Sequence, residues 1–399
     1  MKNLFKASVA LLFGAACLTF ASCSENGTDA PKLSEGDVFL QKILKGDVEN
    51  TINPTYANLA DSCTQLLDAL TAMQPGSITQ SQVDKACEIF LHARAGYEKS
   101  EAFLLGAASH FSIDPHIDSW PLDLTALHNL LSSGQAIATA SNYDQSLIGF
   151  HGIEFILFRD GKNRLASELN TYDSWNRDGL DFTNVKGERE LMFAKAVAED
   201  LRNSVYQLEC AWNENAPKAH FDVLDELGKA YVTDLGKSYG YSMINAGGTG
   251  SVYQSVKLAA SAVLSGDNSA GGIADEVGNT KINNPFSGKD VSYIESPYSW
   301  NSLNDFQNNI HSVENVWYGG VPSKRNQAVS FHAYFQKYDK AVGERVEKAI
   351  QGAIAAIKDI PAPFVKNYQS PKCKVAIDAC QELSDALSEA NDVIQKNTK

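Results

Sequence analysis

The stretch Leu147-Ile-Gly-Phe-His-Gly-Ile-Glu-Phe-Ile-Leu-Phe158 is the most apolar part of the chain after its first residues. As a helix it would be hydrophobic on every side, which predicts a buried central helix rather than a surface one. His151 and Glu154 are its only polar side chains and, three residues apart, they share one helical face. Because an unpaired buried charge is very costly, Glu154 must be protonated, paired or bound to a cation.

Gly149 and Gly152 flank this pair on a different face of the predicted helix. A glycine inside a helix costs about 0.5 to 1 kcal/mol relative to alanine. Two of them beside the polar pair indicate that another backbone segment or a ligand approaches closely.

The remaining periodic segments carry apolar residues at spacings of three and four, which predicts helices. Runs of alternating β-branched residues are absent, so the fold class is all-α, with long helices packed as up-and-down bundles. Two loop-rich segments, 111–123 and 266–298, interrupt the helices. The predicted helices are Val38–Leu44, Tyr56–Met73, Val83–Leu105, Glu188–Trp212, Val223–Leu235, Gly250–Leu264, Leu303–Val316, Phe331–Ile357 and Val375–Ile394.

The first residues have the pattern of a bacterial lipoprotein signal. Lys2 and Lys6 precede an apolar run that ends in Ala21-Ser22-Cys23 and is too short for a spanning helix. We expect a signal peptide over 1–22, a lipid on Cys23, and a solvated tether over 23–34. This places the protein in the cell envelope, anchored to the outer membrane.

The net charge limits the kinds of partner that the protein can bind, and the cysteine spacing indicates the role of the thiols. The formal charge of the chain is −14, and loss of the two lysines within 1–22 makes it −16. An acidic surface argues against nucleic acid as a partner and is compatible with cations. Five cysteines remain beyond Cys23, without a CxxC spacing, and are expected to be buried, with at most one bridge among them.

Several motifs in order resemble those of the imelysin-like family of bacterial envelope proteins, once classed as peptidase family M75 and since linked to iron uptake. Gly149, His151 and Glu154 spell its GxHxxE pattern. The other matching residues are Arg94, Tyr97 and Glu101 in an R-x-x-Y-x-x-S-E-A-F segment, Asp118 and Trp120 in a D-x-W-P-x-D segment, and Ser299, Asn301 and Asn315 in the second half.

The resemblance implies two four-helix bundles packed side by side, here over 35–214 and 215–399, with a functional site at their interface. It implies that His151 and Glu154 are metal ligands and that the other matching residues contribute to binding. The missing ligands could come from Glu101, Asp118, Asp123, Glu276 or the Asn and Ser residues of the second half. Imidazole and carboxylate suit iron or another divalent metal.

The resulting hypothesis is a metal-binding component of iron uptake, membrane-anchored and working with other iron-uptake proteins. Because ligation needs neutral imidazole, metal affinity is expected to fall below about pH 6.5. An HxxE metallopeptidase is the alternative, although the second histidine of a His-Glu-x-x-His site is absent. A structural scaffold in which His151 and Glu154 are a satisfied core pair is the third reading.

Overall fold

The computed structural model describes residues 33–140, 143–177 and 179–399. Residues Ser34–Lys399 form one compact unit. The predicted signal peptide and Cys23 lie outside the described residues. Within them the protein is helical, with only two short β-hairpins, so the all-α prediction is confirmed.

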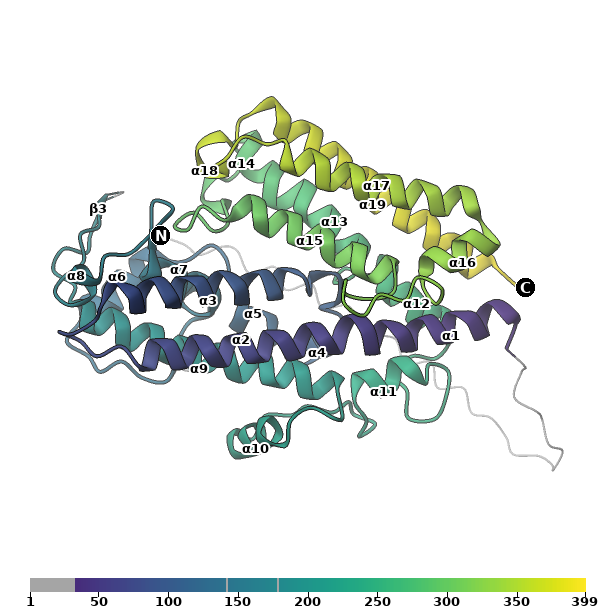
Figure 1. The fold of residues 1–399 in the computed structure, drawn as a ribbon, viewed down its shortest axis with the longest axis horizontal. Coiled ribbons are helices and arrows are strands. Elements are labelled where there is room, and N and C mark those ends of the chain that lie inside the picture. The colour runs from purple at the N-terminus through teal and green to yellow at the C-terminus, as the bar shows by residue number, and fades with distance from the viewer. Residues whose placement is uncertain (1–32, 141–142, 178) are drawn as a thin grey trace, which may run out of the picture. The chain divides into compact units, whose positions relative to one another are not determined.

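The first group of long helices contains α1 (Glu35–Asp47), α2 (Asn53–Thr71), α3 (Gln80–Glu98) and α9 (Gly187–Trp212). The π-helical segment η1 (Val48–Ile52) joins α1 to α2 without a break. Helix α2 packs on both α3 and α9 (Figure 1). Their buried residues recur at spacings of three and four, and this apolar stripe is what holds the group together.

The second group follows in the green and yellow part of the chain (Figure 1). Helix α19 packs on α12, α13 and α17, and α15 packs on α13 and α17. The bounds of these helices are α12 (Val256–Ser265), α13 (Ala270–Glu276), α15 (Ser302–Trp317), α17 (Lys340–Lys358) and α19 (Pro371–Lys396).

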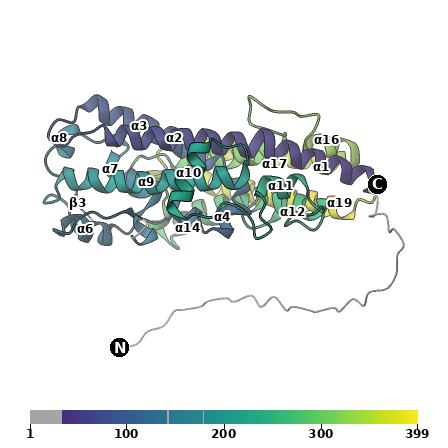
Figure 2. The same cartoon turned by 90° about the horizontal axis from the view of Figure 1, so that it is seen from below.

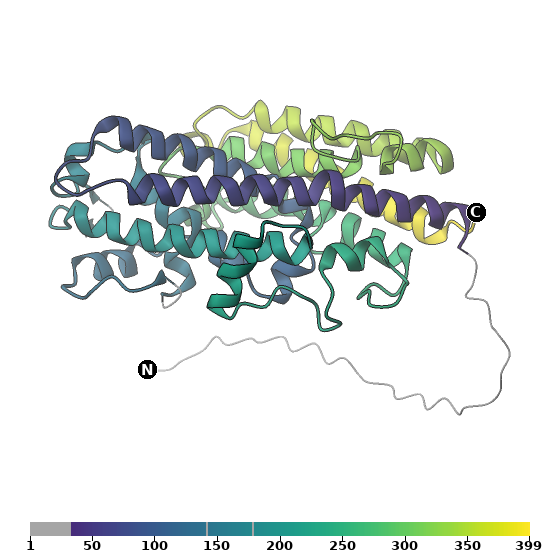
Figure 3. The same ribbon diagram turned by 60° about the horizontal axis from the view of Figure 1, so that its bottom comes forward.

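The two groups meet along several contacts. Helix α15 packs on α3, and α13 and α15 both contact η2 (Glu101–Phe103), the 3-10 turn after α3. Helix α1 contacts α11 (Tyr239–Ile244), α12 and α16 (Phe331–Tyr338), and in Figure 3 the continuous α1–α2 segment runs past the helices of both groups. These contacts make a single unit of residues 34–399; the predicted boundary near residue 214 stays a prediction.

The segments between the long helices carry short elements. Helix α10 (Lys218–Leu227) packs on α9 (Figure 2). The strands pair antiparallel, with Phe158 opposite Asn163 and Asn176 opposite Asp181. The remaining elements are α4 (Ala107–His110), α5 (Asp114–Ile117), α6 (Leu124–Ser132), η4 (Gln145–Leu147), α7 (Gly149–Leu157), β1 (Phe158–Arg159), β2 (Lys162–Asn163), α8 (Ala166–Leu169), β3 (Asn176–Arg177), β4 (Leu180–Asp181), η5 (Val277–Ile282), α14 (Asn283–Ser287), η6 (Val291–Tyr293) and α18 (Phe364–Asn367).

Helix α7 confirms the prediction of a buried central helix, because all nine of its residues are buried. It packs against α3, α5 and α9. Gly149 is the first residue of the helix rather than an interior one, and its φ is +75°. A Cβ at Gly149 would lie 2.3 Å from the carbonyl oxygen of Ile117, and one at Gly152 would lie 2.3 Å from that of Leu147. The predicted close approach of other backbone is therefore present at both glycines.

Several predicted helix boundaries are wrong, each for a local reason. The segment predicted as one helix over 331–357 breaks at Asp339, whose side chain accepts a hydrogen bond from Val342 N and caps α17. The helix predicted over 223–235 begins earlier and ends at Gly228, which adopts φ +65°. The helix predicted over 83–105 ends at Glu98, and the predicted loop over 266–298 contains α13, η5 and α14.

All five cysteines in the described part of the chain are buried with free thiols, as small core residues; no bridge joins them. Among the described residues no helix combines the length and the apolar composition needed to cross a membrane.

Candidate functional site

The site begins with the approach of α7 to the turn after α5. Because Gly149 has no side chain, the start of α7 lies against the backbone of Ile117 and Asp118. His151, two residues further along α7, then reaches Asp118, with Nε2 3.0 Å from Asp118 Oδ1. The indole of Trp120 packs against the imidazole, with ring centroids 4.4 Å apart. His151 is 1% exposed, so these neighbours replace solvent around it.

Glu154 is fully buried and links α7 to the segment before α15. Its Oε1 accepts hydrogen bonds from the backbone N–H of Tyr298, at 3.1 Å, and of Ser299, at 2.8 Å. The Ser299 hydroxyl donates to the same oxygen at 2.6 Å. Glu154 Oε2 lies 3.4 Å from His151 Nδ1. Both oxygens are thus engaged, and His151 stands between two carboxylates.

Arg94 of α3 joins the two halves of the chain at this point. Its guanidinium forms ion pairs with Asp118, with Glu98 at 2.5 Å and with Glu295 at 2.6 Å, and Asp305 lies 3.9 Å away. The Arg94 side chain is 1% exposed. Four acidic groups around one buried guanidinium hold the pKa of Arg94 well above its usual range although burial opposes its charge.

Lys281 of η5 is the corresponding cation of the second half. Its ammonium lies 3.2 Å from Glu295 and 3.8 Å from both Glu98 and Glu101. These carboxylates raise the pKa of Lys281 well above its usual range in spite of its burial. Arg94 and Lys281 therefore remain charged and share the acidic groups between them.

A cavity of about 270 Å³ opens onto this group of charges. We call the cavity and the buried charges around it the polar centre. The carboxylates that line the cavity are Glu101, Asp114, Asp118, Glu276 and Glu295, and Lys281 and Trp120 complete its polar and aromatic wall. It lies where segments of both halves of the chain meet.

Burial shifts several acidic groups of the polar centre toward the neutral form. It raises the pKa of Glu98 to about 8 and that of Asp114 to about 6, and it raises that of Glu101 well above its usual range. Asp118 is the exception, because Arg94 and His151 hold its pKa below the usual value against the effect of burial. A bound cation would displace the protons that these acids hold and would pair with the ionised carboxylates.

The shift in pKa favours the charged form of His151 rather than its neutral form. Burial and the charge of Arg94 lower its pKa, but the carboxylates of Asp118 and Glu154 outweigh them and raise it from 6.5 to about 9. At neutral pH the imidazole is therefore protonated. Its Nδ1 hydrogen-bonds with Glu154 Oε2, and its Nε2 forms an ion pair with Asp118. A metal ion bound at either nitrogen would have to displace a proton.

Two sets of donor atoms in the polar centre are close enough together to hold one ion. One set is Asp118, His151 and Glu295; the other is Glu98, Glu101 and Asp118. Glu295 Oε2 is buried without a hydrogen-bond partner, so this oxygen is available to a ligand. The donor chemistry of carboxylate and imidazole fits a borderline divalent metal.

The sequence-predicted residues fall into two groups in the structure. Arg94, Glu101, Asp118, Trp120, Gly149, His151, Glu154, Glu276 and Ser299 meet at or beside the polar centre. Tyr97 is adjacent through its hydroxyl, which donates to Asp114, and Asn301 donates to Asp305 at 2.5 Å. Asn315 lies elsewhere, where its Oδ1 accepts from Arg325 at 3.0 Å beside a separate cavity. Asp123 caps α6 through Ala126 N and is also outside the centre.

Sequence reasoning missed five charged groups of the polar centre: Glu98, Asp114, Lys281, Glu295 and Asp305. Glu98 follows Arg94 by four residues on one helix, a spacing that could have identified it. Lys281 and Glu295 lie in the segment predicted as loop, where no periodicity marks them.

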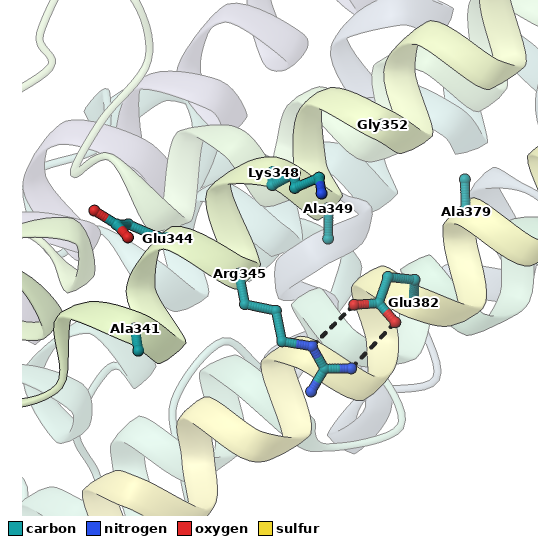
Figure 4. A pocket seen from close by; sticks show the side chains of 8 residues that line it. All are labelled: Ala341, Glu344, Arg345, Lys348, Ala349, Gly352, Ala379 and Glu382. Carbon is teal, nitrogen blue, oxygen red and sulfur yellow. Dashed lines mark hydrogen bonds and ion pairs between the residues drawn. The ribbon is translucent and has the colours of Figure 1, made fainter.

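A groove between α17 and α19 is distinct from this centre (Figure 4). Arg345 crosses it and binds Glu382 through two hydrogen bonds, at 2.9 and 3.1 Å. Glu389 also pairs with Arg345, and all three charged side chains are at least partly exposed. The groove is therefore a surface contact between helices rather than a site with buried donors.

A family model described as Imelysin matches residues 52–390. The chain belongs to the imelysin family. Among curated proteins, Iron-regulated protein A of Synechococcus elongatus is 24% identical over 349 residues, which cover 87% of this chain and 83% of that protein. The family resemblance of the sequence motifs is thereby confirmed.

Two solved structures agree with the fold. An iron-regulated protein A precursor from Parabacteroides distasonis has a TM-score of 0.74 and 26% identity, covering 92% of this chain and 98% of that one. An imelysin-like protein from Psychrobacter arcticum has a TM-score of 0.54 and 13% identity, covering 91% and 95%. The second likeness is one of fold alone.

Proposed function

We propose that this imelysin-family protein binds a divalent metal ion, with iron as the physiological cargo, in the polar centre between its two groups of helices. The observation that carries the proposal is the group of buried carboxylates around a cavity of about 270 Å³. Burial holds several of these acids protonated, and a bound cation can displace those protons and stabilise the ionised carboxylates. Glu295 Oε2, which is buried without a hydrogen-bond partner, supplies a donor atom.

Asp118, Glu295 and His151 are the proposed ligands, because one donor atom from each lies within 4.8 Å of the other two. We propose that Glu154 positions the site. Its Oε1 already accepts three hydrogen bonds from Tyr298 and Ser299, and its Oε2 faces His151 Nδ1. It fixes the imidazole and ties α7 to the second half of the chain.

Iron is favoured by the similarity to proteins named iron-regulated protein A. With the lipid expected on Cys23, the proposal is an envelope lipoprotein, anchored to the outer membrane, that binds iron and hands it to other iron-uptake components.

The test is calorimetric titration of the full-length protein in mild detergent with Fe²⁺ under anaerobic conditions, and with Zn²⁺ and Mn²⁺. We expect about one ion per chain, and at least a tenfold loss of affinity in Asp118→Asn and in Glu295→Gln, since each removes one charged ligand while keeping its shape. Asp123→Asn is the matched control. It removes a carboxylate that the structure places outside the centre, and asparagine still caps α6, so affinity should be unchanged.

Unaltered binding in both Asp118→Asn and Glu295→Gln would refute the metal site and leave the polar centre as core structure. The peptidase alternative predicts a different result, namely metal-dependent peptide cleavage that disappears in His151→Ala. Both donor sets of the described residues contain at most one histidine, so a zinc-peptidase site would need ligands from elsewhere.

A further inference from the structure

A second cavity, of about 670 Å³, lies beside the polar centre and has a different character. We call it the aromatic basin. Its walls are the rings of Trp120, Trp175, Tyr298, Trp300 and Tyr368, which come from four segments far apart in the chain. Ring centroids of Trp175 and Tyr298 are 6.0 Å apart and tilted by 73°. The volume and the mainly apolar lining are those of a small-molecule site.

The rim of the basin carries a small positive excess. Lys366 lies over the Trp300 ring, 4.1 Å from its centroid, and Arg177 lies over the Trp175 ring at 4.0 Å. Among the described residues that line the basin Asp160 is the only acid, and it binds Arg177 through two hydrogen bonds, at 2.8 and 2.9 Å. Lys366 forms no ion pair with the described residues and favours an anionic ligand, in contrast to the chain as a whole, whose formal charge is −14.

Two indole N–H groups of the basin have no acceptor. Trp120 Nε1 and Trp175 Nε1 are both buried without a hydrogen-bond partner, and Trp175 is only 7% exposed. Buried indole N–H groups usually find a partner. Trp120 and Trp175 both line the basin, and a ligand oxygen that reached either nitrogen would supply the missing acceptor.

The basin also includes a residue with a strained backbone. Trp300 adopts a φ of +60°, in a region that residues other than glycine rarely occupy. The Trp300 ring lies so close to Gly161 that a Cβ there would be 2.3 Å from it. Such strain is concentrated at sites that hold a ligand and persists because the surroundings fix it.

We infer that the aromatic basin binds a planar aromatic anion, of the aryl carboxylate class. The ring would stack among the indole and phenol rings, which prefer flat partners, and the carboxylate would pair with Lys366. This inference rests on the basin alone and does not depend on metal binding in the polar centre, with which it shares only Trp120.

The test is calorimetry of the full-length protein in mild detergent with 2-naphthoate. Two further probes separate the contributions: 2-naphthylmethanol has the ring without the charge, and glucuronate has the charge without the flat ring. We expect 2-naphthoate to bind and both other compounds to bind at least tenfold more weakly. No binding of 2-naphthoate, or equal affinity for glucuronate, would overturn the inference.

Single substitutions in the basin test where on the protein the ligand binds. Lys366→Gln should weaken 2-naphthoate binding about tenfold, as expected for the loss of one charge-assisted contact, and should leave 2-naphthylmethanol unaffected. Trp175→Phe keeps a ring but removes the N–H donor and should weaken 2-naphthoate severalfold. Lys372→Gln is the control, because this exposed lysine pairs with Asp359 outside the basin.

Unchanged 2-naphthoate affinity in both Lys366→Gln and Trp175→Phe would place the ligand elsewhere and overturn the inference. Melting temperatures of the variants show that they are folded. Asp118→Asn should lose metal affinity and keep 2-naphthoate affinity, so the two proposals can fail separately.

Discussion

His151 holds a proton between two carboxylates, and this changes what its neighbours can do. Nε2 faces Asp118 and Nδ1 faces Glu154, at 3.0 and 3.4 Å. The pKa of about 9 means that a metal ion competes with the proton throughout the neutral range. The expectation from the unperturbed histidine, a fall in metal affinity below about pH 6.5, therefore moves upward: affinity at this nitrogen should rise with pH as far as about 9.

The raised pKa of His151 predicts a pH-dependent contribution to stability. The folded state binds this proton more tightly than the unfolded state, whose histidine has a pKa near 6.5. The stabilisation is thus fully present below pH 6.5 and is lost as pH rises toward 9. Its size is on the order of 3 kcal/mol.

Comparison of the wild type with His151→Gln measures this contribution. Denaturant unfolding without added metal should give a larger difference in unfolding free energy at pH 6 than at pH 9.5. His92→Gln is the control, because this exposed histidine lines a separate cavity. A difference that does not change with pH would mean that His151 is neutral in the folded protein.

At the scale of the element, α7 depends on glycine for its position. Gly152 has backbone and side-chain neighbours on the side where a Cβ would point, with Leu147 O at 2.3 Å and Phe193 Cζ at 3.4 Å. Any side chain here pushes α7 away from η4 or α9, and with it His151 from Asp118.

Gly152→Ala should therefore destabilise the protein by about 1 to 3 kcal/mol in spite of the better helix propensity of alanine, and Gly152→Leu by at least as much. Gly352 in α17 is the matched control, since nothing lies within 4 Å of a Cβ there and Gly352→Ala should stabilise by about 0.5 to 1 kcal/mol. Thermal and denaturant unfolding measure both. A neutral Gly152→Ala would show that α7 has room to move.

The helix boundaries that were wrong show the limit of periodicity at this scale. The apolar pattern continues through Asp339, but the side chain of that residue caps the next helix and the backbone there is extended, with φ −158°. In the segment 266–298, α13, η5 and α14 form one helical run without a break, and the π-helical η5 in its middle shifts the apolar period away from that of a regular α-helix.

At the scale of the whole molecule, buried ion pairs join the two groups of helices. Arg94 of the first half binds Glu295 of the second, while Lys281 of the second lies beside Glu98 and Glu101 of the first. Breaking one partner of such a buried network leaves an uncompensated charge. The site and the packing of the two groups therefore depend on the same residues.

The expected lipid anchor also belongs to this scale. Replacing Cys23 with Ser removes the sulfur that would carry the lipid, and should move the protein from the membrane fraction to the soluble fraction and abolish labelling by a fatty-acid analogue. Cys17→Ser, in the same leader, is the control and should remain membrane-bound. A Cys23→Ser protein that stays membrane-bound and labelled would contradict the lipoprotein prediction.

The sequence by itself determined the helical class, the burial of α7 and the pairing of His151 with Glu154. These follow from local spacing: residues three and four apart meet on a helix whatever the rest of the chain does. The ion pair of Arg94 with Glu98, four residues further along α3, follows from the same local spacing. The motifs also marked Asp118, Trp120 and Ser299, although spacing alone gave no reason for them to meet α7.

Only the tertiary structure decided which distant groups complete the site. Asp118 reaches His151 because Gly149 lets two backbones touch, and Lys281 and Glu295 arrive from a segment without a periodic pattern. The same holds for the protonation of His151, since its pKa depends on burial and on carboxylates that are distant in sequence as well as near. The interaction of two charges depends on their distance in space, and this distance cannot be read from their separation along the sequence.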